Sequence, residues 1–173
     1  MAVNWRLFDN FNANQTFYTD ANGLEMQERR LNYNPGFQWA QDAQNISGNF
    51  YPVDSAIAMR DKAKHVQVTV MNNRAQGGSA DLTKSTIELI QHRRLLQDDN
   101  KGLNEILNET DSKGVGIKVS AKYFMQIFDQ IKGESHQRQQ QMRIDTPIQY
   151  YFAMDTKFDA RAQMPSLGKT QKL

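Results

Sequence analysis

Two adjacent arginines are followed by two adjacent aspartates in the run from His92 to Asp99. The guanidinium groups of Arg93 and Arg94 present a fixed fork of donors, which can bind a carboxylate or two neighbouring sugar hydroxyls. Asp98 or Asp99 can accept the complementary hydrogen bonds. Because adjacent residues of a strand point to opposite faces, we expect one Arg to face inward or toward a cleft. The alternative is a solvated strand end with exposed ion pairs worth about 0 to 1 kcal/mol each, and spacing alone favours it.

No catalytic pair or metal site is apparent in this sequence. Asp98 and Asp99 diverge on an extended chain, whereas two carboxyl groups that cleave one glycosidic bond must lie about 5 to 9 Å apart. The three histidines, His65, His92 and His136, are isolated, and cysteine is absent. A zinc site requires several such ligands close together. We therefore predict no catalytic residue and no metal ligand in this chain.

The sequence Gln76-Gly77-Gly78-Ser79 has two interpretations. Glycine-rich loops can hold phosphate, but this one lacks the lysine of a P-loop and follows no βαβ pattern. The other interpretation is a turn at which the backbone approaches a neighbour closely, as only glycine allows. We predict a structural turn here.

The composition indicates a folded chain that does not bind nucleic acid. Hydrophobic residues make up 39% and aromatic residues 10% of the 173 positions, which is more aromatic content than disordered chains carry. The mean hydropathy of −0.73 owes much to amides, since there are 14 Asn and 18 Gln. A net charge of +2 gives only a weak positive field.

Membrane and targeting signals are sparse. No apolar run approaches the roughly 20 residues that span a bilayer, and Met1 to Thr19 lacks the pattern of a signal peptide. We therefore expect no membrane span, and no signal peptide at the visible start. N-glycosylation sequons at Asn14, Asn45 and Asn108 weakly favour the secretory route.

The hydrophobic pattern has mostly a period of two, which is typical of strands. The turn-forming pair Asn22-Gly23 predicts a hairpin between two of them. Leu103, Ile106 and Leu107 predict a single short turn of helix. The expected strands are 17–19, 24–30, 65–70, 86–90, 117–128 and 148–154. Half-buried spacing is expected at 65–70, and burial on both faces near Phe128.

These elements predict one all-β domain over residues 1–173, an antiparallel β-sandwich. We expect loose ends at 1–13 and 165–173. The Gln-rich stretch 132–141 is expected to be a low-complexity loop.

Five motifs together resemble glycoside hydrolase family 38, the lysosomal-type α-mannosidases, in order from about Thr16 to Phe128. Ala80 departs from the family pattern, in which a second Ser often follows Gly-Gly-Ser. The motifs are Phe17-Tyr18-Thr19-Asp20 with Asn22-Gly23, Glu28-Arg29-Arg30, Gly48-Asn49-Phe50-Tyr51-Pro52-Val53, Gln76-Gly77-Gly78-Ser79, and His92-Arg93-Arg94-Leu95-Leu96 with Asp98-Asp99 and Gly102.

The resemblance implies a retaining, zinc-dependent enzyme that removes terminal α-linked mannose from glycans in the lysosome or secretory pathway. The matched region belongs to the C-terminal β-sandwich. The zinc ligands and the nucleophile belong to an N-terminal α/β domain that nothing here resembles, so the isolated chain is expected to be an incomplete and inactive piece. Arg93 is implied as the substrate-facing Arg, with Arg94 and Asp99 beside it.

Two alternatives remain open. The amide and aromatic content also suits a stand-alone carbohydrate-binding module with a β-sandwich fold. A sandwich with a purely structural role is the third possibility.

Overall fold

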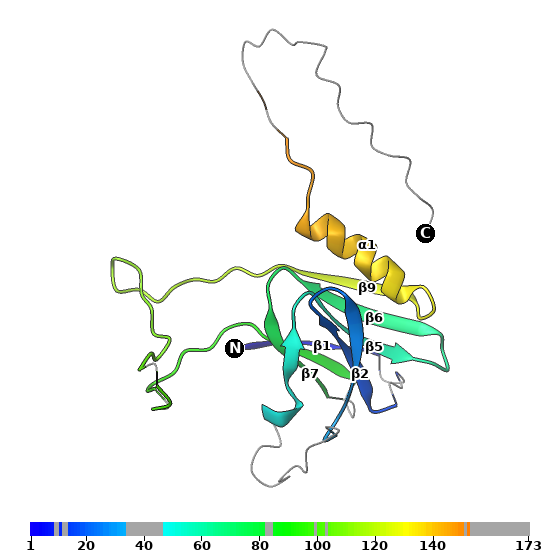
Figure 1. Cartoon of the computed structure of the whole chain (residues 1–173), viewed down its shortest axis with the longest axis horizontal. Helices are drawn as coiled ribbons and strands as arrows, with labels where there is room; N and C mark the ends of the chain where they lie inside the picture. The colour runs from blue at the N-terminus through cyan, green and yellow to red at the C-terminus, as the bar shows by residue number, and fades with distance from the viewer. Residues whose placement is uncertain are drawn as a thin grey trace.

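The computed structural model describes residues 1–8, 11, 14–33, 47–81, 85–98, 100–102, 104–150 and 152 (Figure 1). They form strands, one short 3-10 helix (η1) and one α-helix. In chain order the elements are β1 (Ala2–Arg6), β2 (Thr16–Ala21), β3 (Glu25–Arg30), η1 (Ser47–Asn49), β4 (Tyr51–Val53), β5 (Ala56–Asp61), β6 (Val66–Asn72), β7 (Gln76–Asp81), β8 (Thr86–Ile90), β9 (Tyr123–Asp129) and α1 (Gly133–Asp145).

The strands form two sheets in which every pair is antiparallel. The smaller sheet has the order β1-β8-β7-β4, and the larger has the order β3-β2-β5-β6-β9. Apolar side chains fill the space between the sheets, and Phe17, Ile57, Val70 and Leu89 are fully buried there. The predicted all-β antiparallel sandwich is confirmed.

The predicted hairpin is also confirmed. Strands β2 and β3 pair from Thr16↔Arg30 to Ala21↔Glu25. Asn22 and Gly23 between them have φ values of 52° and 69°, the positive values that an Asn-Gly turn requires.

The prediction of a loose N-terminus over residues 1–13 is wrong at its beginning. Ala2–Arg6 is a strand, β1, paired with β8 from Ala2↔Ile90 to Arg6↔Thr86. Trp5 packs against the core and meets Tyr123 edge to face, with ring centroids 5.0 Å apart. Because this short segment pairs with β8, it forms the edge strand of the smaller sheet. The end at 165–173 lies outside the described residues.

The predicted turn at Gln76–Ser79 is wrong, because these residues belong to strand β7, between β4 and β8. The predicted close approach of the backbone is present at Gly78. A Cβ added there would lie 2.5 Å from Val53 Cγ2 and 2.9 Å from Leu89 Cδ2. The absence of a side chain at Gly78 therefore lets Val53 and Leu89 pack against its backbone.

The predicted loop at 132–141 is wrong as well, since α1 covers Gly133–Asp145. Glu, Gln, Arg and Met are good helix formers, and α1 lies over β6 and β9 (Figure 1). It covers the polar face of β6, so that Gln67 and Thr69 are buried beside Val68 and Val70. Strand β6 is therefore enclosed on both faces, where the alternation predicted a half-buried strand.

The C-terminal strand predictions hold only in part. Of the segment 117–128, only the part from Tyr123 pairs with β6, and Phe128 is half-buried where burial was expected. Ile148, Tyr150 and Phe152 are exposed and form no strand, because no partner strand lies beside them in the described chain. Met154 lies outside the described residues.

The predicted helical turn is absent at Ile106 and Leu107, while Leu103 is not described. Among the described residues, no helix has the length and apolar character needed to cross a membrane.

Candidate functional site

Residues 91–122, here called the arm, connect β8 to β9 and project away from the sandwich (Figure 1). The arm is described except at 99 and 103. Its first residues are held by the chain start, because the Met1 amino group donates to the His92 carbonyl at 2.7 Å and Gln91 N donates to Met1 O at 3.0 Å. Strands β1 and β8 therefore anchor the base of the arm.

Arg93 and Arg94 lie directly beyond this anchor, and both side chains are exposed. Neither Arg faces inward in the described chain, because β8 ends at Ile90 and the strand alternation ends with it. The other alternative, that one Arg faces a cleft, stays a prediction. Neither guanidinium forms an ion pair with another described residue. A Cβ added at Gly116 would lie 3.7 Å from Arg94 Nη1. The Arg94 side chain therefore lies close to Gly116, in the part of the arm that leads back to β9.

Asp98, the described aspartate of the run, binds neither of these arginines. Asp98 Oδ2 accepts a hydrogen bond from Asn100 N at 2.7 Å and so closes a local turn. Asp99 lies outside the described residues. The donors of Arg93 and Arg94 are therefore available to a group that this part of the chain does not supply.

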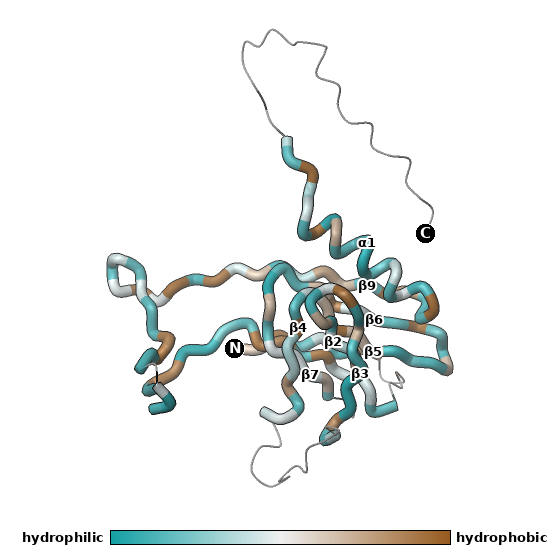
Figure 2. The backbone as a smooth tube through the Cα atoms, in the orientation of Figure 1, coloured by the Kyte–Doolittle hydropathy of each residue, from teal (hydrophilic) through white to brown (hydrophobic). Residues whose placement is uncertain are grey.

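The tip of the arm is an ordered turn. Asp111 Oδ1 accepts hydrogen bonds from Lys113 N and Val115 N, each at 2.9 Å, and Thr110 bridges to Gly116. Hydrophobic stretches recur along the arm in Figure 2. Leu96 is 99% exposed, and Leu107, Val115 and Ile117 are also exposed. Apolar side chains gathered on a projecting segment are typical of a contact surface.

The strand order places Gln76 to Ser79 beside the arm base. Gly77 pairs with Ile90, and Gly78 pairs with Leu89. Gln76 Nε2 donates to Tyr123 Oη at 2.8 Å, which links β7 to the strand that follows the arm. The run therefore supports the strand that leads to Arg93.

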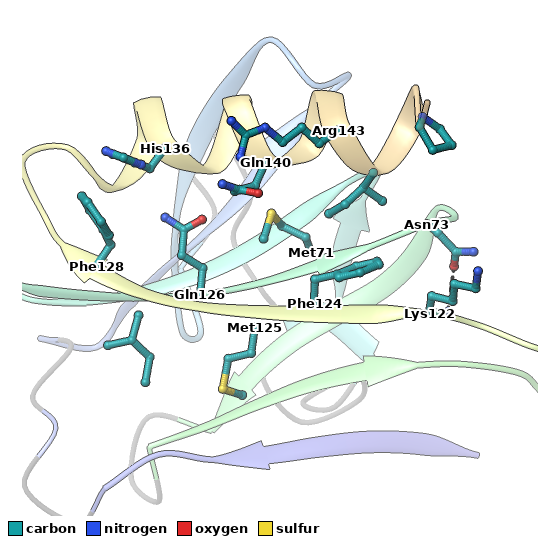
Figure 3. A pocket seen from close by; sticks show the side chains of 13 residues that line it. Met71, Asn73, Lys122, Phe124, Met125, Gln126, Phe128, His136, Gln140 and Arg143 are labelled. Atoms are coloured by element: carbon teal, nitrogen blue, oxygen red, sulfur yellow. Dashed lines mark hydrogen bonds between the residues drawn. The ribbon is translucent and has the colours of Figure 1, made fainter. Parts of the chain in front are cut away.

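A groove of about 810 Å³ lies between α1 and β9 (Figure 3). Figure 3 shows Phe124, Gln126 and Phe128 pointing from β9 toward the helix. His136 packs on Phe128 with ring centroids 3.9 Å apart. Gln140 and Arg143 border the groove from the helix side. Aromatic faces beside amides and cations can bind a neutral or anionic polar ligand.

The sequence did not predict this groove, because the helix that forms one wall was expected to be a loop. A strand pattern at Phe124, Gln126 and Phe128 was apparent, but the element facing it was not. The signal that was available is the helix propensity of 133–145.

A second cavity of about 560 Å³ separates the β2–β3 turn from α1. Asn22 and Asp54 lie on one side, with Asn22 N donating to Asp54 Oδ2 at 2.9 Å. Gln141 and Asp145 lie on the other, joined by a 3.0 Å hydrogen bond from Gln141 Nε2. On each side of this cavity, the polar groups named here hydrogen-bond to each other.

The described residues contain no group of three or more His, Asp or Glu side chains able to hold a metal ion. His65 follows β5, His92 lies at the arm base and His136 lies on α1. Of the sequons, Asn14 and Asn108 are exposed, and Asn45 lies outside the described residues.

The chain matches the family model described as the glycosyl hydrolases family 38 C-terminal domain over residues 6–101. It is 39% identical over 133 residues to a lysosomal alpha-mannosidase of Felis catus, covering 76% of this chain and 12% of that protein. It is 45% identical over 96 residues to a lysosomal alpha-mannosidase of Homo sapiens, covering 56% and 9%.

A probable alpha-mannosidase of Arabidopsis thaliana is 37% identical over 145 residues, covering 82% of this chain and 14% of that protein. The chain thus spans about a tenth of the length of the curated relatives it matches. The matched residues include all of β2 to β8 and the base of the arm.

Proposed function

The chain belongs to glycoside hydrolase family 38, in the C-terminal domain, and we propose that it is the part of an α-mannosidase that delivers an Arg to the mannose site. The substrate would be terminal α-linked mannose of glycans, because alpha-mannosidase is the name that the relatives carry. The single observation that carries the proposal is the exposure of Arg93 and Arg94 on a projecting arm, without a described partner.

The chemistry of this proposal follows from the donors of a guanidinium. Two parallel N–H groups match two neighbouring hydroxyls of one sugar ring. Hydrogen bonds to ring hydroxyls that strengthen in the transition state contribute to glycoside hydrolysis. We assign Arg93 to the substrate, with Arg94 beside it and Asp99 as a residue that orients them. Strand β8, fixed by β1 and β7, sets the position of the pair.

The remaining parts of the site are proposed to come from an N-terminal α/β domain of the full enzyme. A retaining reaction requires two carboxyl groups about 5 to 5.5 Å apart, and this chain offers no such pair in the run around Arg93. Zinc is proposed as the cofactor of the full enzyme. The described residues do not fit it, because they contain no group of three possible ligands. No step by this chain therefore depends on zinc, and the isolated chain is proposed to be inactive.

The proposed location is the lysosome or secretory pathway. It is supported by the word lysosomal in the names of several relatives and by the exposed sequons at Asn14 and Asn108. Either Asn would accept a glycan only along that route.

The proposal is tested by Arg93→Ala in a complete enzyme that contains this chain. We expect kcat/KM for an aryl α-mannoside to fall by about 100-fold, the loss expected for a charge-assisted contact made in the transition state. Arg30→Ala, at a residue in an exposed pair with Glu28, is the matched control. An unchanged kcat/KM in the first variant would remove Arg93 from the site.

A second candidate function is a stand-alone carbohydrate-binding module. The groove between α1 and β9 favours it, because Phe124 and Phe128 lie beside the amides of Gln126 and Gln140. Calorimetric titration of the purified chain with α-mannosides separates the two functions. Saturable binding that is lost in Phe124→Ala supports the module, whereas no heat of binding supports the enzyme portion.

A further inference from the structure

The arm begins on one sheet and ends on the other. It leaves β8 of the smaller sheet after Ile90 and returns to β9 of the larger sheet at Tyr123. The connection between β6 and β7 makes the same crossing beside it, because Asn72 pairs with Tyr123 and Gly77 pairs with Ile90. Residues 73–76, between these two pairs, therefore lie at the base of the arm.

Two amide side chains of residues 73–76 hold the returning end of the arm. Asn73 Oδ1 accepts a hydrogen bond from Lys122 N at 3.0 Å (Figure 3). Gln76 Nε2 donates to Tyr123 Oη at 2.8 Å. The ring of Tyr123 also meets Trp5 of β1 edge to face. Tyr123 thus joins β9 to two strands of the smaller sheet, which is the sheet that the arm leaves.

The connection between β6 and β7 is itself fixed to the sandwich. Asn72 is 1% exposed, and its Nδ2 donates to the carbonyl oxygens of Val53 and Arg74. Gln76 belongs to β7, where it pairs with Val53 of β4. The amides of Asn73 and Gln76 therefore attach the arm to a segment that β4 holds in place.

The two halves of the arm approach each other near the arginine pair. Arg93 and Arg94 lie on the segment that leaves β8 after Ile90. The Arg94 side chain lies close to Gly116, which belongs to the returning half. A displacement of the returning end at Tyr123 would therefore move the chain that lies beside the pair.

From these contacts we propose that Asn73, Gln76 and Tyr123, here called the clamp, are positioning residues for Arg93. The clamp holds the returning end of the arm against the sheet that carries the outgoing end, and so fixes the guanidinium before a substrate arrives. Prior placement matters, because a displacement of about 1 Å can cost about 100-fold in rate. The inference rests on the proposed function, in which Arg93 contacts mannose in the transition state.

Tyr123→Phe tests the clamp in a complete enzyme that contains this chain, because it removes only the hydroxyl that Gln76 binds and keeps the ring that meets Trp5. We expect kcat for an aryl α-mannoside to fall by about tenfold with KM unchanged, the pattern of a contact made in the transition state. Tyr18→Phe is the matched control and should change neither constant. Its hydroxyl donates to Glu28 Oε2 at 3.2 Å, but β5 and β6 separate its strand from β9.

The double variant with Arg93→Ala distinguishes positioning from a loss of folded protein. If Tyr123 acts through Arg93, Tyr123→Phe should lower kcat no further once Arg93 is Ala. A purely structural role would lower kcat by the same factor in both backgrounds and would overturn the inference. An effect of Arg93→Ala without an effect of Tyr123→Phe overturns the inference and leaves the proposed function standing. No effect of Arg93→Ala overturns both.

A measurement that does not depend on turnover tests the backbone bond of the clamp. Asn73→Ala removes the acceptor of Lys122 N, whereas Asn73→Asp keeps an oxygen at that place. Hydrogen exchange of arm peptides, followed by mass spectrometry in the same enzyme, should become about tenfold faster around Lys122 in Asn73→Ala. It should stay at the wild-type rate in Asn73→Asp. Unchanged exchange in Asn73→Ala would show that the clamp does not hold the arm, and would overturn the inference.

Discussion

Asp20 binds Ser55 through both carboxylate oxygens, across 35 residues of sequence. Oδ1 accepts from Ser55 N at 2.8 Å, and Oδ2 accepts from Ser55 Oγ at 2.8 Å. The same carboxylate accepts from Ala56 N and Gly23 N, each at 3.0 Å. Asp20 is only 4% exposed. It therefore fixes the β2–β3 turn to the start of β5, in the middle of the larger sheet.

Replacing Asp20 by Ala should lower the free energy of unfolding by about 3 kcal/mol, because hydrogen bonds to a charged group are worth roughly 1.5 to 3 kcal/mol and buried donors are left unpaired. Urea unfolding followed by far-UV circular dichroism measures the change. Asp111→Ala is the control, since Asp111 closes the exposed turn at the arm tip. A loss of less than 1 kcal/mol in Asp20→Ala would contradict the role assigned to its carboxylate.

The two glycines of β7 form a matched pair for a packing test. A Cβ at Gly78 would lie 2.5 Å from Val53 Cγ2, whereas the nearest heavy atom to a Cβ at Gly77 would be Ile90 Cδ1 at 3.7 Å. We expect Gly78→Ala to destabilise the fold by about 1 to 3 kcal/mol through overpacking. Gly77→Ala should change the stability by far less. Equal effects in thermal unfolding would show that the close approach at Gly78 does not exist.

Two arginines of this chain should differ in their contribution to stability. The Arg60 guanidinium lies 4.0 Å from the ring centroid of Tyr18, and its Nε donates to Gln67 Oε1 at 2.7 Å. Arg60→Ala should therefore cost on the order of 1 kcal/mol. Arg93→Ala, at an exposed residue without a described partner, should stay within about 0.5 kcal/mol of the wild type.

Chemical denaturation of both variants checks this prediction. Comparable destabilisation by Arg93→Ala would mean that Arg93 supports the fold of this chain, and its availability to a substrate would then be refuted.

The sheet could be predicted from the sequence where a local signal and a partner strand coincide. The Asn22-Gly23 step predicted the β2–β3 hairpin, because positive φ values leave few alternatives. Val66, Val68 and Val70 predicted β6 from their alternation. Ile148, Tyr150 and Phe152 show the same alternation but have no neighbouring strand in the described chain. A period of two therefore indicates the tendency to form a strand and does not supply its partner.

Helix α1 could not be predicted from apolar spacing because its buried side is not apolar. Its buried residues are Gly133, Gln137 and Gln141, spaced four apart. A Cβ at Gly133 would lie 2.7 Å from Gln67 Cδ, so the helix start packs closely on a buried amide. A helix that docks through glycine and amides gives no hydrophobic signal, and the groove it forms with β9 was missed for the same reason.

The local geometry of the arginine run could not be predicted from strand alternation. Alternation along a strand predicted opposite faces for Arg93 and Arg94, yet β8 ends before them at Ile90. What a guanidinium binds beyond the arm depends on groups outside the described chain, and no pattern within the sequence specifies them.

We propose that this chain supplies an Arg to a mannose site that other residues of the enzyme complete. The most direct measurement is the hydrolysis of an aryl α-mannoside by the purified, folded 173-residue chain with added zinc, beside a full-length family member as positive control. We expect no turnover above background by the chain alone. Zinc-dependent hydrolysis by this polypeptide, abolished by a chelator and restored by zinc, would contradict it.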